Sequence, residues 1–246
     1  EASVTLEAGK MADVISSQAV ENEAPILGDT SPLSTEELKQ RAFATMAAQN
    51  RAVTREDYMT LCYAMPSKFG KVKRVNIVQD TDSLKRNLNL YVISEDTSGN
   101  FTEPNETLKN NLKTWINKKR MMNDTVDIFS GKIINYGINF EVIPELDINR
   151  FELLQRCVAR LISDYSIKRN LGEPVYISEI YQSLNDVPGV IDTTNVELVN
   201  NSGGAYSNFS YDIDSNLSSD GRFLIIPEDA VAEILVPNED ISGVIK

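Results

Sequence analysis

The chain has 246 residues, of which 41% are hydrophobic, enough to bury one large core or two modest ones. Its formal net charge is −12 and its pI is near 4.6, which disfavours nucleic acid and anionic membranes, because a phosphate-binding surface needs an excess of Lys and Arg. No apolar run reaches the roughly 18 residues that span a bilayer, so we expect a soluble protein without membrane insertion. Its partners should be proteins.

The chain has no histidine and two cysteines. The missing histidine removes the commonest general base and zinc ligand. Cys62 and Cys157 fall on the apolar stripes of predicted helices without CxxC spacing, so we expect buried thiols in a reducing cytosol. Glu1 stands where an initiator Met would, and no signal-peptide pattern follows it, so we expect a piece of a longer chain.

Residues 1–33 mix short apolar pieces with proline and glycine and show no helical period, which predicts the end of an upstream β-rich domain and a linker. Residues 34–66 predict a pair of helices. In the first, Ser34 and Glu37 form an S-x-x-E capping box. The positions of this helix that we expect to be buried are Leu38, Ala42 and Met46.

The chain breaks at 50–53 and begins a second helix at Thr54, where a T-x-x-D pattern reaches Asp57. Its apolar stripe is Tyr58, Leu61, Cys62 and Met65. Pro66 ends the helix.

Residues 67–144 predict a first α+β domain, with strands over 71–79 and 87–94, a helix over 105–121 and a strong strand over 133–143. The strict alternation in that last strand predicts one buried and one wet face. The apolar stripe of the helix is Leu108, Leu112, Trp115 and Ile116.

Residues 145–246 predict a second α+β domain that begins with a long helix capped by Asp147. The expected core side of that helix is Phe151, Leu154, Val158, Leu161, Ile162 and Tyr165. A short helix over 177–185 stops at a Pro-Gly pair, and a strand follows. The Asn-, Ser- and Gly-rich stretch 200–220 has little to bury and predicts a mobile loop.

The segments "RFLIIP" and "AVAEILVP" then predict short closing strands. Helices and strands alternate without a regular βαβ rhythm, which favours a multi-domain α+β fold with mixed or antiparallel sheets covered by helices and a β-rich N-terminal remnant.

The sequence contains partial matches to a phosphate-binding and a calcium-binding motif, and neither match is complete. "SKFGKVK" lacks the earlier Gly and the final Ser or Thr of a P-loop. "DIDSNLSSDG" begins like an EF-hand, but Leu217 and Phe223 stand where Gly and the bidentate Glu should be. The basic cluster Lys118-Lys119-Arg120 ends a helix, where the macrodipole favours positive charge; contact with an anion or an acidic partner is the alternative. We expect no catalytic residue, no cofactor and no metal.

The stretch "STEELKQRAFATMAAQNRAVTREDYMTLCYAMPSKFGKVKRVNIV", with the later "GEPVYISEIYQSLNDVPGV", resembles the baseplate J-like family of contractile phage tails and related injection machines. The residues that carry the resemblance are Arg41, Arg51, Ala52, Val53, Thr54, Asp57, Tyr58, Pro188, Gly189 and Val190. Matching pieces are scattered over 34–199. The Asn-rich style and the ending "PNEDISGVIK" are similar to baseplate wedge proteins of T-even-type phages.

The resemblance implies a non-enzymatic structural subunit of the virion tail baseplate, assembled in the host cytoplasm. Members self-associate and join other wedge proteins into the ring around the tail hub, which changes diameter on contraction. The break at 50–53 then joins a central domain to the C-terminal part. Arg51 is expected to brace that corner through an ion pair with Glu56 or Asp57.

We expect at least a homodimer, extended into a ring by a second contact. Terminal apolar strands need a covering partner, so the candidate interface residues are Phe223, Leu224, Ile225, Ile234 and Leu235. Two alternatives stay open. One is a protein-interaction scaffold unrelated to phages. The other is an enzyme using Asp and Glu alone, for which a deep pocket with two convergent carboxylates would be the sign.

Overall fold

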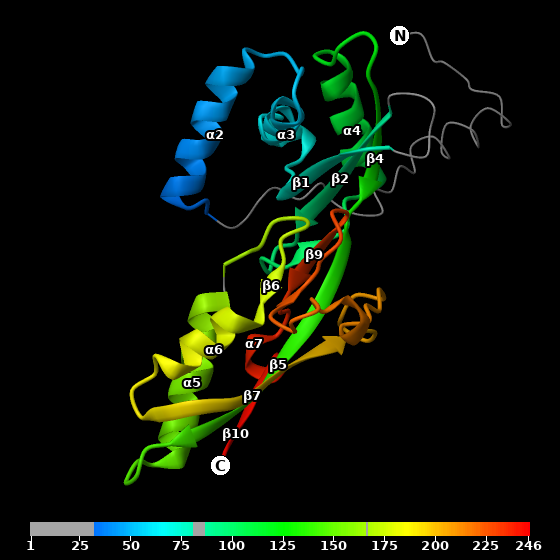
Figure 1. Cartoon of the computed structure of the whole chain (residues 1–246). Coiled ribbons are helices and arrows are strands. Elements are labelled where there is room, and N and C mark those ends of the chain that lie inside the picture. Colours follow the sequence, from blue (N-terminus) through cyan, green and yellow to red (C-terminus); the bar gives the residue numbers. More distant parts are fainter. Residues whose placement is uncertain (1–31, 81–86, 166) are drawn as a thin grey trace, which may run out of the picture.

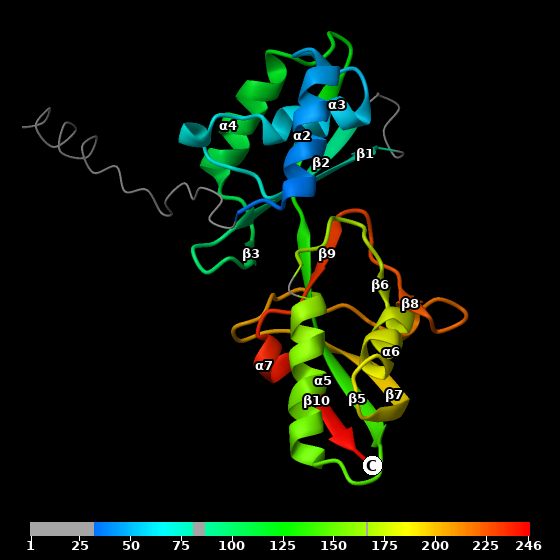
Figure 2. The ribbon, with the colours of Figure 1, turned by 90° about the vertical axis from the view of Figure 1, so that its left-hand side faces the viewer.

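The computed structural model describes residues 32–80, 87–165 and 167–246, which form an α+β fold of two lobes (Figure 1). We name residues 32–130 the N-terminal lobe and 132–246 the C-terminal lobe. A view turned by 90° shows the same elongated arrangement, with one lobe above the other (Figure 2). The predicted α+β class with mixed sheets is confirmed. The predicted β-rich remnant falls on residues 1–31 and lies outside the described residues.

The N-terminal lobe is a small mixed sheet with helices on one face. Its elements are α2 (Thr35–Ala48), α3 (Arg55–Tyr63), η1 (Ser67–Phe69), β1 (Arg74–Gln79), β2 (Asn87–Glu95), β3 (Phe101–Thr102), α4 (Glu106–Asn117) and β4 (Thr125–Ser130). Strand β2 pairs antiparallel with β1 and parallel with β4, while β3 pairs with its last residues. Leu61 of α3 and Leu112 of α4 meet Leu90 and Val92 of β2 in one apolar core.

The C-terminal lobe is built around one long strand. Its elements are β5 (Lys132–Pro144), α5 (Arg150–Tyr165), β6 (Val175–Tyr176), α6 (Ile177–Asn185), β7 (Val190–Asn201), η2 (Asp214–Asn216), β8 (Phe223–Leu224), β9 (Ala230–Glu233), α7 (Pro237–Asp240) and β10 (Ile241–Ile245). Strand β5 pairs antiparallel with β7 and parallel with β9 and then β10. Helices α5 and α6 share its core. The predicted alternation is confirmed in its second half, where Phe140 is buried and Asn139 exposed.

At Gly131, between β4 and β5, the chain leaves the sheet of the N-terminal lobe and enters the sheet of the C-terminal lobe (Figure 1). Sequence analysis assigns the strand over 133–143 to the first domain, whereas β5 lies in the sheet of the C-terminal lobe. Alternation reveals a strand but not the sheet it joins. The domain boundaries themselves stay a prediction.

The expectation that α2 buries an apolar stripe is wrong. Leu38 is 52% exposed and Met46 is 80% exposed, and Ala48 is the buried residue of the helix. The half-buried side chains of Glu37 and Arg41 lie on the side that faces the lobe, where they join an ion-pair network. A polar contact therefore sets which face of α2 turns inward.

Two further expectations in the C-terminal lobe are corrected. Asn149, not Asp147, caps α5, because its Oδ1 accepts the Phe151 N–H at 3.0 Å. Phe151 itself is 68% exposed, and the buried positions of α5 are Leu153, Cys157 and Leu161. The other expected positions are confirmed: Leu161 is buried, and Leu154, Val158, Ile162 and Tyr165 pack partly buried against the core.

The stretch 200–220 buries more than its composition suggests. Tyr211 and Ile213 belong to the main core of the lobe, and the Ser207 N–H donates to Asn135 Oδ1 at 2.8 Å. The expectation that it has little to bury is wrong. The expected state of the thiols is confirmed, since Cys62 and Cys157 are free and buried. In the described part of the chain, no helix has both the length and the apolarity needed to cross a bilayer.

Candidate functional site

The first part of the site is the corner between α2 and α3, where most of the family-like motif lies. Gln49 and Asn50 take left-handed φ values of 47° and 67°, which end α2 and turn the chain. Ala52 is then 1% exposed and donates its N–H to Lys119 O at 3.0 Å. The corner is therefore fixed to the end of α4, almost seventy residues later.

The motif pair Thr54 and Asp57 forms a reciprocal capping box. The Asp57 N–H donates to Thr54 Oγ1 at 3.2 Å, while Asp57 Oδ2 accepts the N–H groups of Thr54 at 2.9 Å and Val53 at 3.2 Å. The hydrogen bond from the Thr54 backbone is the largest of several causes that lower the pKa of Asp57 below its ordinary value. The role of Thr54 and Asp57 is therefore to stabilise the start of α3.

Tyr58 attaches the corner to the connection between α4 and β4. It is 1% exposed, and its hydroxyl donates to Asp124 Oδ2 at 2.6 Å. Burial is the largest cause that raises the pKa of Tyr58, and this hydrogen bond is the second. Among the described residues, Arg51 forms no ion pair within 4 Å with Glu56 or Asp57, although its positive charge is one of the causes that lower the pKa of Asp57.

The second part of the motif lies in the other lobe, so the structure does not bring the two parts together. Gly189 has a φ of 101°, and a Cβ there would lie 2.5 Å from Ile148 Cδ1. Its carbonyl accepts the Glu145 N–H at 2.9 Å, and Val190 pairs with Pro144. The Pro188–Val190 turn thus holds the start of β7 against the β5–α5 connection.

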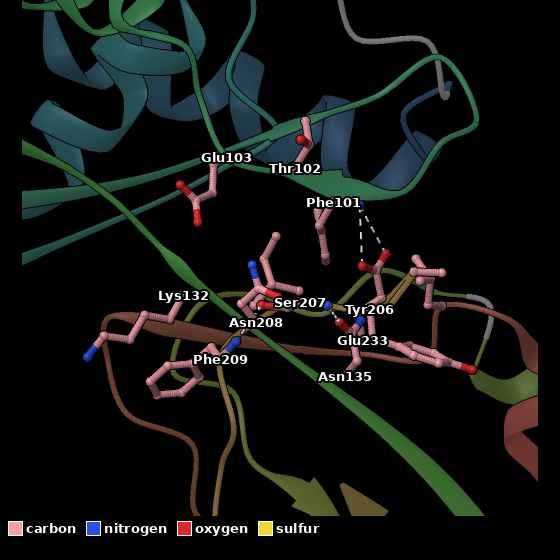
Figure 3. A pocket seen from close by; sticks show the side chains of 13 residues that line it. Phe101, Thr102, Glu103, Lys132, Asn135, Tyr206, Ser207, Asn208, Phe209 and Glu233 are labelled. Carbon is pink, nitrogen blue, oxygen red and sulfur yellow. Dashed lines mark hydrogen bonds between the residues drawn. The ribbon is translucent and has the colours of Figure 1, made fainter. Parts of the chain in front are cut away.

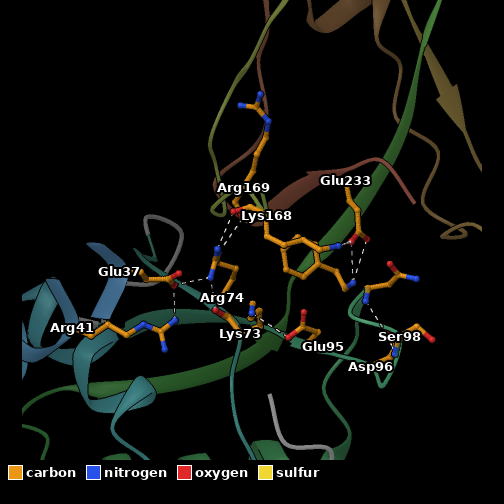
Figure 4. Close-up of polar contacts among 12 residues, drawn as sticks. Glu37, Arg41, Lys73, Arg74, Glu95, Asp96, Ser98, Lys168, Arg169 and Glu233 are labelled. Carbon is orange, nitrogen blue, oxygen red and sulfur yellow. Dashed lines mark hydrogen bonds and ion pairs between the residues drawn. The ribbon is translucent and has the colours of Figure 1, made fainter. Parts of the chain in front are cut away.

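Between the lobes lies a polar joint centred on Arg74, the first residue of β1 (Figure 4). Its guanidinium donates to Glu37 Oε1 of α2 at 3.1 Å. It also donates to the carbonyl oxygens of Lys168 at 2.9 Å and Arg169 at 3.1 Å, in the C-terminal lobe. One buried cation therefore connects α2, β1 and the segment that follows α5.

A second polar contact crosses the joint at Glu233 of β9. Its carboxylate accepts the Phe101 N–H at 3.1 Å and forms an ion pair with Lys168 (Figure 4). Burial raises the pKa of Glu233, while Lys168 opposes that shift. Nearby, Lys73 and Glu95 form a buried pair at 3.1 Å.

An apolar cluster completes the joint between the lobes. It contains Ile93, Phe101, Ile133, Leu171 and Val231. A Cβ on Gly131 would lie 2.7 Å from Ile93 Cγ1 and 3.1 Å from Leu171 Cδ2. Only glycine lets the chain pass from β4 to β5 through this cluster without displacing it.

A pocket of about 420 Å³ opens beside the joint and is lined by the two carboxylates Glu103 and Glu233 (Figure 3). The Glu233 carboxylate points to the Phe101 amide and not toward Glu103, which lies on the other side of Phe101 (Figure 3). Because they do not converge, the two groups do not form an acid–base pair. Among the described residues, no group of three or more Cys, Asp and Glu is arranged to hold a metal.

The candidate interface strands are largely paired within the chain itself. β8 pairs with β6 and β9 pairs with β5, and Leu224 is fully buried. Phe223 is half-buried against Tyr176, and Ile234 packs on the core. Ile225 is 48% exposed, and Leu235 lines the pocket at the joint.

Sequence reasoning missed the joint, although one signal was present. Arg74 begins β1 and Glu233 ends β9, each next to apolar strand residues, and a charge in such a place needs a partner when it is buried. Neither the partner's identity nor the glycine crossing can be read from local pattern.

Comparison with known proteins gives a likeness in structure but none in sequence. No family model matches the chain, and no curated protein matches it. Among solved structures, the chain is similar to one in the 6-fold symmetrised baseplate of the anti-feeding prophage, with a TM-score of 0.49 and 15% sequence identity. The likeness covers 83% of this chain and 42% of that one, so this chain spans less than half of that chain's length.

Proposed function

We propose that the chain is a non-enzymatic structural subunit of a baseplate wedge in a contractile tail or related injection machine. The observation that carries the proposal is the family-like motif of Ala52–Tyr58 with its later Pro-Gly-Val turn. In this fold Thr54 and Asp57 cap a helix, and Tyr58 ties that helix to the α4–β4 connection. Residues that hold two segments in a fixed geometry are what a structural subunit requires.

The arrangement of the lobes supports a role in an assembly that changes shape. The lobes are connected by one strand crossing at Gly131 and by the contacts of Arg74 and Glu233. We propose that these contacts keep the lobes together as a unit, and that contraction moves such units relative to their neighbours. The ring around the hub and the other wedge proteins are the partners in this proposal.

Self-association is part of the proposal, as at least a dimer. The N-terminal lobe exposes large apolar side chains on α2, with Phe43 78% exposed and Met46 80% exposed. At the C-terminal lobe, Ile225 and Leu235 remain the candidate contacts from sequence. Substituting Ile225→Asp and Leu235→Asp in one chain should weaken dimerisation if that edge is used.

The test of the baseplate role uses the phage or producer strain that encodes the chain. Tail particles are purified and stripped of sheath and tube, and the baseplates are analysed by quantitative mass spectrometry beside gold labelling of an epitope-tagged chain. We expect the chain in a fixed ratio to other wedge proteins, with gold at the distal end of the tail. Intact tails that lack the chain would refute the role.

A further inference from the structure

The two lobes carry opposite charge. Residues 32–130 contain 15 Lys and Arg against 12 Asp and Glu, whereas residues 132–246 contain 8 Lys and Arg against 18 Asp and Glu. Although the net charge of the whole chain is −12, one lobe is therefore weakly basic and the other strongly acidic. Because the lobes lie one above the other, the chain is electrically polar along its length (Figure 1).

The far end of the N-terminal lobe is a basic and apolar surface, which we call the head patch. It is formed where the α2–α3 corner meets the end of α4, through the hydrogen bond from Ala52 to Lys119. Met122 is 97% exposed and Val53 is 52% exposed. The head patch consists of Arg51, Val53, Lys118, Lys119, Met121 and Met122.

Two carboxylates border the head patch, and its three basic side chains, Arg51, Lys118 and Lys119, outnumber them. Asp57 accepts the N–H groups of Val53 and Thr54, and Asp124 accepts the Tyr58 hydroxyl. Arg51 and Lys118 are exposed. The patch therefore presents a net positive charge around the fully exposed Met122 and the half-exposed Val53 and Met121.

The far end of the C-terminal lobe is an acidic and apolar surface, which we call the tail patch. It is formed by the β5–α5 connection and the start of β7, held together by the Glu145 N–H and the Gly189 carbonyl. Leu146 is 89% exposed and Phe151 is 68% exposed. The tail patch consists of Glu145, Leu146, Asp147, Phe151, Glu152 and Ile191.

Two arginines border the tail patch. Arg150 is exposed, and Arg156 lies 3.9 Å from Glu152 while donating to the Pro188 carbonyl. Three carboxylates lie within the patch itself, so acidic groups still outnumber basic ones there. Figure 1 shows the β5–α5 connection at the opposite end of the molecule from the α2–α3 corner.

From this complementarity we propose that the head patch of one copy binds the tail patch of a second copy. Head-to-head or tail-to-tail pairing would set like charges against each other, whereas head-to-tail pairing opposes basic to acidic charge around two apolar centres. A heterologous contact of this kind closes into a ring when its rotation allows. The inference rests on the proposed self-association and names its second contact.

The experiment uses two full-length variants, each with one patch reversed. Arg51→Glu with Lys118→Glu reverses the sign of the head patch, and Glu145→Lys with Glu152→Lys reverses that of the tail patch. All four side chains are exposed, so melting temperatures should match that of the unaltered chain. Glu197→Lys, an exposed charge change on the wet face of β7, is the control and should associate like the unaltered chain.

Each variant is immobilised and the binding of both variants is measured at low salt. We expect the head-reversed chain to bind the tail-reversed chain at least about tenfold more tightly than either binds itself. We also expect weaker binding at 0.5 M salt, because the Debye length is then on the order of 4 Å and the charges are screened. Equal binding in all pairings would overturn the head-to-tail contact and leave self-association standing. Absence of binding in every pairing would overturn the contact as well. The tail-particle assay tests the baseplate role independently of both results.

Discussion

The motif corner and the joint between the lobes are both small, and they are built in opposite ways. The turn of the corner is made by neighbours in sequence: Thr54 caps the helix in which Tyr58 lies, and Asp57 completes the cap. Distant contacts, from Ala52 to Lys119 and from Tyr58 to Asp124, then only hold the finished turn in place. The joint is made by residues far apart in sequence, such as Phe101 and Glu233, which are 132 positions apart. Local chemistry thus fixes how the chain turns, and long-range contacts fix how the lobes meet.

Of the substitutions at the joint and at the corner, Gly131→Val should have the largest effect. The new side chain would enter the cluster that contains Ile93 and Leu171, where even a Cβ is too close. We expect a loss of about 2–3 kcal/mol in the free energy of unfolding, measured by urea denaturation. Thr125→Val, at the exposed start of β4, is the control and should stay within about 0.5 kcal/mol. Equal stability of both variants would show that the crossing is not tightly packed.

Arg74→Met should come next. It removes the donor that satisfies two carbonyl oxygens of the C-terminal lobe and the Glu37 carboxylate. Leaving buried acceptors unpaired costs about 1–3 kcal/mol, and we expect the loss to be accompanied by faster proteolysis between the lobes. Arg160→Met breaks a partly exposed pair with Asp164 and should cost less than about 1 kcal/mol. If Arg160→Met is as damaging as Arg74→Met, the joint has no special role.

At the corner, Asp57→Ala should cost about 0.5–1 kcal/mol at pH 7, because two backbone N–H groups lose their acceptor. The pKa of Asp57 is lowered in the folded chain. Its contribution is therefore complete above its unfolded pKa of about 3.9 and is lost as pH falls through the lower folded pKa. Unfolding curves at pH 7 and pH 2.5 should show the gap between Asp57→Ala and the unaltered chain narrowing. A gap that is constant with pH would exclude the cap carboxylate as its cause.

The sequence predicted what neighbours decide and failed where distant partners decide. Thr54 and Asp57 were predicted with their roles, and the alternation of β5 was predicted with its buried face. The face of α2 that turns inward was not predicted, because Glu37 turns toward Arg74, a residue 37 positions away. The start of α5 was also misplaced, because Asp147 and Asn149 are both plausible caps and only the turn geometry separates them.

The smallest expected effect is at α2. Leu38→Ala should change the free energy of unfolding by less than about 0.5 kcal/mol, because the side chain is more than half exposed. Leu61→Ala on α3 is the matched variant and should cost about 2–5 kcal/mol, because Leu61 is 3% exposed. Chemical denaturation of both variants measures the comparison. A large loss for Leu38→Ala would mean that α2 packs by the face that sequence alone suggested.

The central claim is that the chain is an association module of a larger assembly. Sedimentation velocity of the unaltered chain, from sub-micromolar to about 100 µM at low and high salt, tests it most directly; protein contacts of standard size commonly give micromolar or tighter binding. The account predicts species larger than the 27.4 kDa chain that grow with concentration and recede with salt. A single 27.4 kDa species at every concentration and salt level would contradict it.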